Sequence, residues 1–144
     1  MAITATLSGS LSITVKGDLK VAQFIKDIST GGEVHETVVN VGTETTTKVF
    51  DITTSTLSSF DVLWIESDKD VYVEFVVDDG NNVGEEVWAQ KLRAGTAIAM
   101  PYDDAKANYT VNFAAGSDDV VETVRVRNES TTDTASVRLI VIGT

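Results

Sequence analysis

The sequence predicts an all-β protein, an antiparallel β-sandwich or jelly roll with an N-terminal arm and at most one short helix. Valine and threonine are frequent, and both are β-branched residues that favour strands. Apolar and polar residues alternate over most of the 144 residues, in short segments that recur about every ten residues. Because no long helical pattern separates these segments, we expect antiparallel rather than parallel sheets.

Residues 1–60 predict an arm together with the first strands of the sandwich. Apolar residues alternate with serine and threonine over 3–7 and 11–15, and Gly9 between them predicts a bulge or a bend. The apolar positions of this arm are predicted contacts with another subunit: Ile3, Leu7 and Leu11. Residues 61–144 carry both tryptophans and the densest alternation, so we expect the core sandwich there, within one structural domain overall.

Residues 18–29 fit two interpretations. The apolar residues of this segment have the spacing of one helix face: Val21, Phe24, Ile25 and Ile28. Asp18 precedes them as a helix cap, and the short helix is the favoured interpretation. The alternative is a strand with one face made by Leu19, Val21, Gln23 and Ile25.

The rest of the chain predicts a series of short strands. They cover residues 34–41, 46–52, 62–67, 70–77, 85–92, 96–100, 107–115, 121–129 and 136–143. Asp68-Lys69 predicts a tight hairpin between two of these strands, and residues 93–95 predict another turn.

The segment 96–100, TAIAM, is asymmetric as a strand. Its larger residues share one side and fill a core, whereas Ala97 and Ala99 on the other side allow a second sheet or subunit to approach closely. These two alanines are therefore predicted interface residues. In the preceding segment, Trp88 and Leu92 share one face and are predicted core residues.

The chain is acidic, with 11 lysines and arginines against 22 aspartates and glutamates and a net charge of −11. We therefore expect no nucleic-acid partner and no anionic membrane surface, because both need an excess of cations on the protein. The apolar runs are too short for a membrane span, and the N-terminus lacks the pattern of a secretory signal. The chain has no cysteine, which excludes disulfides and thiolate metal sites.

His35 is the only histidine, and Glu36 beside it would point to the opposite face of a strand. No nucleophile motif accompanies this histidine, and zinc would need further nitrogen or sulfur ligands. We interpret His35 as a partly exposed structural residue. The aspartates lie mostly in turns, where their side chains stabilise the backbone, and are interpreted as solvated turn residues.

The loop at 78–82 offers oxygen ligands of the type that Ca²⁺ prefers, with Asp78, Asp79 and Asn81 as the ligands to test first. Their spacing does not match an EF-hand, so we predict no bound metal and no cofactor.

Arg125 and Arg127 share one face of their predicted strand, and Arg138 joins them if the last two strands pair. In so acidic a protein we expect these arginines to meet carboxylates, within the domain or across a subunit contact.

Four segments resemble a layout found in small tailed-phage virion structural proteins of jelly-roll type, the capsid decoration or cement proteins. They are DVLWIESDKDVYVEFVV, EEVWAQKLRAGTAIAM, KANYTVNF and SVRLIVIG. The matching turn has the pattern K-L-x-x-G, from Lys91 to Gly95, and the resemblance covers residues 61–143. It implies a homo-oligomer, often a homotrimer, that contacts the major capsid protein or other virion proteins and has no catalytic residues.

The predicted function is therefore that of a non-enzymatic structural protein of the virion, which stabilises a bacteriophage particle through oligomeric contacts. The alternative is a carbohydrate-binding β-sandwich module, whose sites present exposed aromatic residues. The candidates for such a site are Trp64, Tyr72, Trp88, Tyr102 and Tyr109. Trp64 and Trp88 lie within apolar alternation and are predicted core residues. An enzyme is disfavoured, because no catalytic constellation is recognisable.

Overall fold

The computed structural model describes residues 3–15, 18–30, 33–57, 60–78, 86–101 and 120–143. These ranges contain ten strands and one 3-10 helix, and no α-helix is found in them. The elements are β1 (Ile3–Val15), β2 (Asp18–Thr30), β3 (Glu33–Val41), β4 (Thr45–Asp51), η1 (Ile52–Thr54), β5 (Phe60–Ser67), β6 (Val71–Asp78), β7 (Glu86–Leu92), β8 (Ala97–Pro101), β9 (Val120–Asn128) and β10 (Ala135–Gly143). None of the described helical segments is long and apolar enough to cross a membrane.

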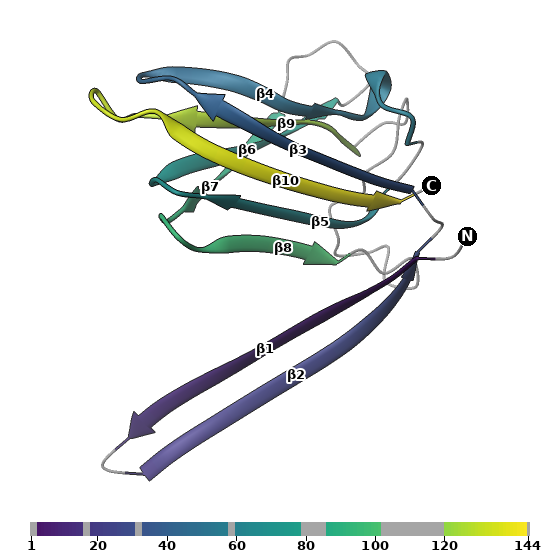
Figure 1. Ribbon diagram of the computed structural model, residues 1–144, viewed down its shortest axis with the longest axis vertical. Coiled ribbons are helices and arrows are strands. Elements are labelled where there is room, and N and C mark those ends of the chain that lie inside the picture. The colour runs from purple at the N-terminus through teal and green to yellow at the C-terminus, as the bar shows by residue number, and fades with distance from the viewer. Residues whose placement is uncertain are drawn as a thin grey trace.

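Eight of the strands form two antiparallel four-stranded sheets that pack face to face (Figure 1). Sheet 1 has the order β3-β10-β5-β8, and sheet 2 has the order β4-β9-β6-β7. Successive strands of the sandwich lie in different sheets at every link except β6–β7, whose two strands belong to sheet 2. This arrangement is a jelly roll, and the predicted fold class is confirmed.

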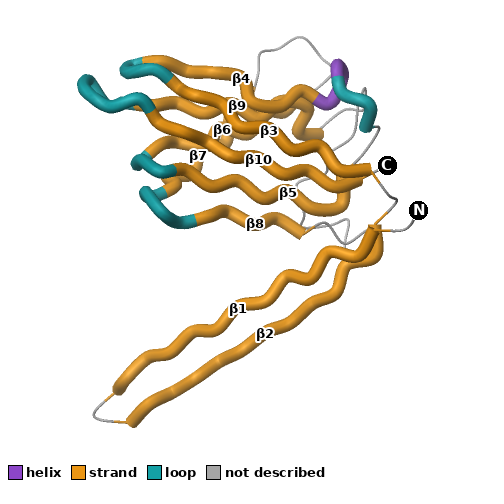
Figure 2. Tube along the Cα trace, in the orientation of Figure 1, coloured by secondary structure: helices purple, strands orange, loops and turns teal. Residues whose placement is uncertain are grey.

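The predicted hairpin at Asp68-Lys69 is wrong, because β5 belongs to sheet 1 and β6 to sheet 2. Each strand already has hydrogen-bonded neighbours on both sides, so the short link crosses between the sheets instead of pairing them. The turn at residues 93–95 crosses in the same way. These links lie together at one end of the sandwich, as the teal segments in Figure 2 show.

Aspartates hold these crossing links in place. Asp68 accepts a hydrogen bond from the Ser136 backbone N–H at 2.7 Å, and Asp70 accepts one from the Ala94 N–H at 2.9 Å. The Ala94 N–H is the main cause of a lowered pKa at Asp70. These aspartates therefore serve the backbone, in agreement with their interpretation as turn residues.

The core lies between the two sheets and is made of the inward positions of alternating strands. Its largest fully buried side chains are Phe75, Ile52, Leu63, Ile65, Leu92, Leu139, Val41, Val71 and Val73. Full burial of each such aliphatic or aromatic side chain contributes about 1.5–3 kcal/mol relative to exposure. The prediction of Leu92 as a core residue is confirmed.

Trp88 is not a core residue, since 47% of it is exposed. Its strand, β7, is the edge strand of sheet 2, so one side of the indole has no neighbouring strand to cover it. The ring stacks instead on buried Phe75, its register partner, with 5.1 Å between ring centroids. Only Leu92, at the end of β7, reaches the core.

The predicted helix at 18–29 is wrong, and the alternative strand is confirmed. Residues 18–30 form β2, which pairs with β1 over 13 residue pairs, from Ile3–Thr30 to Val15–Asp18. The register continues through Gly9 without a bulge. A single helix of this length is marginal in water, whereas the ladder with β1 gives every second residue a backbone partner.

The β1–β2 hairpin, called the arm below, belongs to neither sheet. It extends away from the sandwich as a pair of long strands (Figure 1). Among its described side chains, Leu19 and Val21 are 65% and 53% exposed. The sandwich itself starts at β3, so the first 60 residues contribute both the arm and the first two strands of the jelly roll.

Candidate functional site

The outer face of sheet 1 carries exposed apolar side chains. Its outward positions follow from the register, in which Ile140 lies between Glu36 and Trp64, and Trp64 lies opposite Ala99. We call it the sheet-1 outer face and define it by Val34, Glu36, Val38, Trp64, Glu66, Ala97, Ala99, Arg138, Ile140 and Ile142.

Apolar side chains on this face are open to solvent. Val34 and Val38 are 52% and 62% exposed, and Trp64, Ile140 and Ile142 are half-buried. Ala97 is exposed and Ala99 half-buried, whereas Ile98 between them is buried. The prediction is confirmed for Ile98, whereas Thr96 is exposed and precedes the strand; the alanine side lies on the sheet-1 outer face.

One arginine ties together the polar residues of this face. Arg138 binds the Glu36 carboxylate through Nε at 2.8 Å and Nη2 at 2.7 Å, and its Nη1 lies 3.3 Å from Glu66. The hydrogen bond with Glu36 is the main cause of a raised pKa at Arg138. Trp64 donates its indole N–H to Glu66 at 3.3 Å. Two carboxylates thus share one guanidinium, and the group has a net charge of −1.

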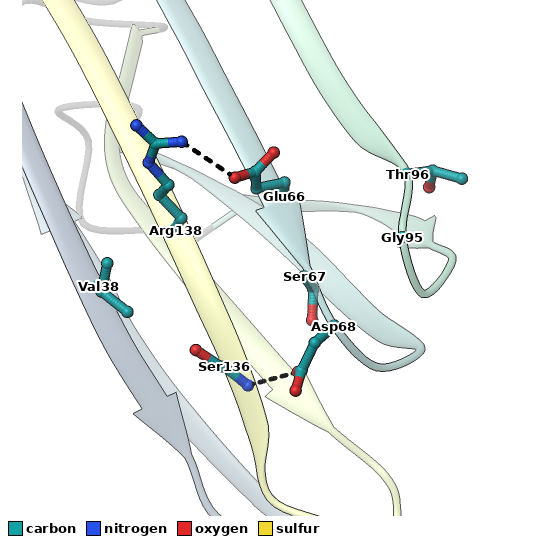
Figure 3. A pocket seen from close by; sticks show the side chains of 8 residues that line it. All are labelled: Val38, Glu66, Ser67, Asp68, Gly95, Thr96, Ser136 and Arg138. Carbon is teal, nitrogen blue, oxygen red and sulfur yellow. Dashed lines mark hydrogen bonds and ion pairs between the residues drawn. The ribbon is translucent and has the colours of Figure 1, made fainter.

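A hollow of about 400 Å³ lies where this face meets the crossing links (Figure 3). It is lined by Val38, Glu66, Ser67, Asp68, Gly95, Thr96, Ser136 and Arg138. Gly95 has φ +71°, which a glycine adopts without strain, and its N–H donates to the Ser67 carbonyl at 2.9 Å. Several polar groups of the hollow bond one another.

The outer face of sheet 2 carries four cationic side chains together with the exposed Val87. Lys48, Lys91, Arg125 and Arg127 share it with Tyr72 and Glu74. Glu74 is only 9% exposed, and its carboxylate lies 2.9 Å from Arg127 Nε and 3.4 Å from Arg125 Nε. The bond to Glu74 is the main cause of a raised pKa at Arg127, whose guanidinium also lies 4.7 Å from the Tyr72 ring centroid.

The three arginines meet carboxylates within the domain, as expected, but they do not form one group. Arg125 and Arg127 share a face of β9, in sheet 2. Arg138 lies on β10, in sheet 1, because the last two strands do not pair.

The remaining predicted residues fall in different places. Ile3, Leu7 and Leu11 lie on β1, opposite Thr30, Lys26 and Ala22 of β2. Asp78 is the last residue of β6, whereas Asp79 and Asn81 lie outside the described residues, as do Tyr102, Tyr109 and the whole of the predicted strand 107–115. Within the described ranges no group of three His, Asp or Glu residues is arranged to hold a metal ion.

His35 is exposed, and its ring lies 5.6 Å from that of Phe50, between centroids. Glu36 binds Arg138 on the opposite side of the strand. The structure thus places the two side chains on opposite faces, as predicted, and His35 is exposed.

Trp64 is a surface residue that the sequence interpretation placed in the core. A signal for this face exists in β10, where Ile140 and Ile142 alternate with buried Leu139 and Val141. Apolar residues on both sides of one strand indicate that its sheet has an apolar outer face.

Comparison of the chain with known protein families, with curated proteins and with solved structures gives no match.

Proposed function

We propose that the protein is a non-enzymatic structural protein of a bacteriophage virion, a capsid decoration or cement protein that acts as a homo-oligomer. The observation that carries this proposal is a jelly roll with a long hairpin arm that belongs to neither of its sheets. Residues 61–143, where the resemblance to such proteins lies, contribute six of the eight strands of the jelly roll.

The arm is suited to intermolecular contact. Its 13 residue pairs make a ladder about 44 Å long at the usual rise per residue. An isolated two-stranded hairpin is only marginally stable in water and needs a third strand or a second packing layer. Since the described part of its own sandwich supplies no further strand, a partner molecule is the natural source of that layer.

The sheet-1 outer face supports the same function. Cement proteins act by adding buried area across joints between capsid subunits, which is a mechanism of contact. An apolar sheet face with a small polar network and an adjoining hollow provides such contact area. The partners in this proposal are other copies of the chain, in a trimer, and the major capsid protein or other virion proteins.

Mass spectrometry of density-gradient-purified virions tests the proposal. We expect the protein in fixed stoichiometry with the major capsid protein, and we expect deletion of residues 1–16 to reduce the bound amount at least tenfold. Absence of the protein from virions of a phage that expresses it in infected cells would overturn the proposal.

A carbohydrate-binding module is the second candidate, and the exposure of two aromatic residues favours it. Trp88 is half exposed on an edge strand, and Trp64 lies on the sheet-1 outer face beside Glu66. A glycan array and a melting-temperature titration with calcium test this function. Silence in both assays would remove it, whereas binding lost in the Trp64→Ala or Trp88→Ala variant would establish it.

A further inference from the structure

We propose that the sheet-1 outer face of one copy is the seat for the β1–β2 arm of a second copy, so that copies join by exchanging arms. This inference gives the oligomer of the proposed function a defined contact and rests on that function only for its role in a particle. In this contact the two groups of predicted interface residues, which lie in different parts of one copy, meet across two copies. Ala97 and Ala99 are on the seat, and Ile3, Leu7 and Leu11 are on the arm.

The register gives the arm two different faces. On β1, the odd-numbered positions are apolar apart from Gly9, and the even-numbered ones are serine or threonine. The apolar row shares its face with the even-numbered positions of β2, since Leu7 pairs with Lys26 and Leu11 with Ala22. Lys20, Phe24 and Ile28 occupy the same face by register. We call this side the apolar arm face.

The arm leaves the sheet-1 outer face of its own copy open. Val34 and Val38 keep more than half of their surface exposed with the arm in place, and the arm runs away from the sandwich (Figure 1). Packed sheets lie about 10 Å apart, and a row with Ala97 and Ala99 lets a hairpin come this close. The arm therefore reaches a second molecule more readily than its own seat.

Charge selects sheet 1 over sheet 2 as the seat. Residues 1–32 contain three lysines and two aspartates, a net charge of +1, and removing them from the totals of 11 and 22 leaves eight cations and 20 acids, a net charge of −12 for residues 33–144. Two of the arm lysines, Lys20 and Lys26, and one aspartate, Asp18, are on the apolar arm face, which leaves it a net charge of +1. The seat offers Glu36 and Glu66 against one arginine, a net charge of −1. The four cations of the sheet 2 outer face pair with four carboxylates, Asp51, Asp70, Glu74 and Glu129, and leave no net charge. Complementary charge therefore favours the seat on sheet 1.

The area requires exchange rather than a single docked arm. Nine-residue strands make the sheet about 30 Å deep, and a hairpin is about 10 Å wide, so one arm buries about 600 Å² counted on both partners. Stable interfaces bury about 1,200 Å² or more. A reciprocal pair, in which each copy gives one arm and receives the other, buries about 1,200 Å² between the two copies and reaches this lower limit. In a closed ring each contact buries about 600 Å², and each copy takes part in two such contacts.

Cysteine cross-linking of the full chain tests the seat directly, because the protein has no cysteine of its own. Two differently tagged copies are co-expressed, one with Ala22→Cys on the arm and one with Ala99→Cys on the seat. The control replaces Ala99→Cys by Ala89→Cys, which substitutes the same residue type on the outer face of sheet 2, opposite Glu74. The purified oligomers are treated with a bis-maleimide whose span of about 10 Å matches the spacing of packed sheets.

We expect the Ala22→Cys/Ala99→Cys pair to give at least tenfold more cross-linked heterodimer than the Ala22→Cys/Ala89→Cys pair. Equal yields, a higher yield with Ala89→Cys, no heterodimer, or a monomer in sedimentation velocity would each overturn the inference. The same experiment separates this inference from the proposed function. If the copies cross-link but the protein is absent from virions, the proposed function is wrong and the inference stands. If the Ala22→Cys arm cross-links in virions only to another virion protein, the inference is wrong and the proposed function stands.

Discussion

The two outer faces of the sandwich come from the same fold and the same alternation of residues, yet they differ in chemistry. On sheet 1, isoleucine, valine and alanine surround one arginine that serves two carboxylates. On sheet 2, four cations surround a carboxylate that is nearly buried. Inward positions are constrained by the core in both sheets. The outward positions are free of that constraint. The chemical difference between the two outer faces is therefore the better guide to function.

The largest expected effect comes from removing the arm. Deletion of residues 1–30 is expected to weaken self-association at least about 100-fold, equivalent to about 2.7 kcal/mol, since the exchanged contact is lost. The melting temperature of the sandwich should change little, because the arm strands belong to neither sheet. Sedimentation velocity and circular dichroism measure the two quantities, and an unfolded sandwich would show that the arm has a structural role within its own copy.

Glu74→Ala is expected to cost the largest amount of folding stability on the sheet 2 outer face. It removes the carboxylate shared by Arg125 and Arg127, at a position that is 9% exposed. Breaking a buried ion pair costs about 3–5 kcal/mol, and partial exposure of the arginines reduces the expected loss to about 1–3 kcal/mol. Urea denaturation measures it. The matched change on sheet 1, Glu66→Ala, should cost less than about 1 kcal/mol, because that pair is exposed; equal costs would contradict the comparison.

Reversal of the arm charges is expected to have a smaller effect, confined to association. In the double variant Lys20→Glu/Lys26→Glu the attraction to Glu36 and Glu66 becomes repulsion, and we expect about tenfold weaker self-association, or about 1.4 kcal/mol. The difference from the unmodified protein should shrink at high salt. Lys91→Glu, on the outer face of sheet 2, is the control and should leave association unchanged; a similar loss in that variant would argue against a seat on sheet 1.

The smallest predicted effect is a dependence of stability on pH near the edge of sheet 2. The hydrogen bond from Lys48 to Asp51, 2.5 Å long, is the main cause of a pKa at Asp51 below its ordinary value of 3.8. Because the pKa of Asp51 is lower in the folded state than in the unfolded state, the ionised carboxylate stabilises the fold at pH values above the unfolded pKa. This contribution is lost as the pH falls through the pKa of the folded state. Asp51→Asn should therefore be less stable than the unmodified protein by well under about 1 kcal/mol at neutral pH. Urea midpoints should converge below pH 3.8; a difference that persists in acid would assign the effect to the cap of η1 instead.

The strands could be predicted from the sequence because each carries its signal locally. Alternation identified the segment at 136–143, and the observed strand, Ala135–Gly143, buries every second residue. Residues 18–29 were ambiguous, since Val21 and Ile25 satisfy both a helix face and a strand face. Pairing with β1 makes this segment a strand. Such pairing depends on both segments and cannot be predicted from the sequence of one of them.

The site was harder to predict for the same reason. Ala97 and Ala99 were identified from a local asymmetry, but their neighbours Trp64 and Glu66 are set by the register between β5 and β8. Trp64 and Trp88 were assigned to the core because apolar alternation does not say which sheet a strand joins or whether it lies at an edge. The hairpin expected at Asp68-Lys69 failed in the same way, because a short polar link fits a crossing between sheets as well as a turn within one.

Asn128 has a consequence for how this protein can vary. Its buried amide donates to the carbonyls of Val41 and Asp133, at 3.1 and 2.7 Å, and its oxygen accepts the Ser130 N–H at 3.0 Å. One side chain thus anchors both sides of the exposed connection between β9 and β10, at the end of the sandwich opposite to the first residues of β3 (Figure 1). We expect a peptide inserted between Thr131 and Thr132 to be tolerated, because Asn128 holds the base of the connection. The connection thus combines a base fixed by one buried side chain with an exposed tip.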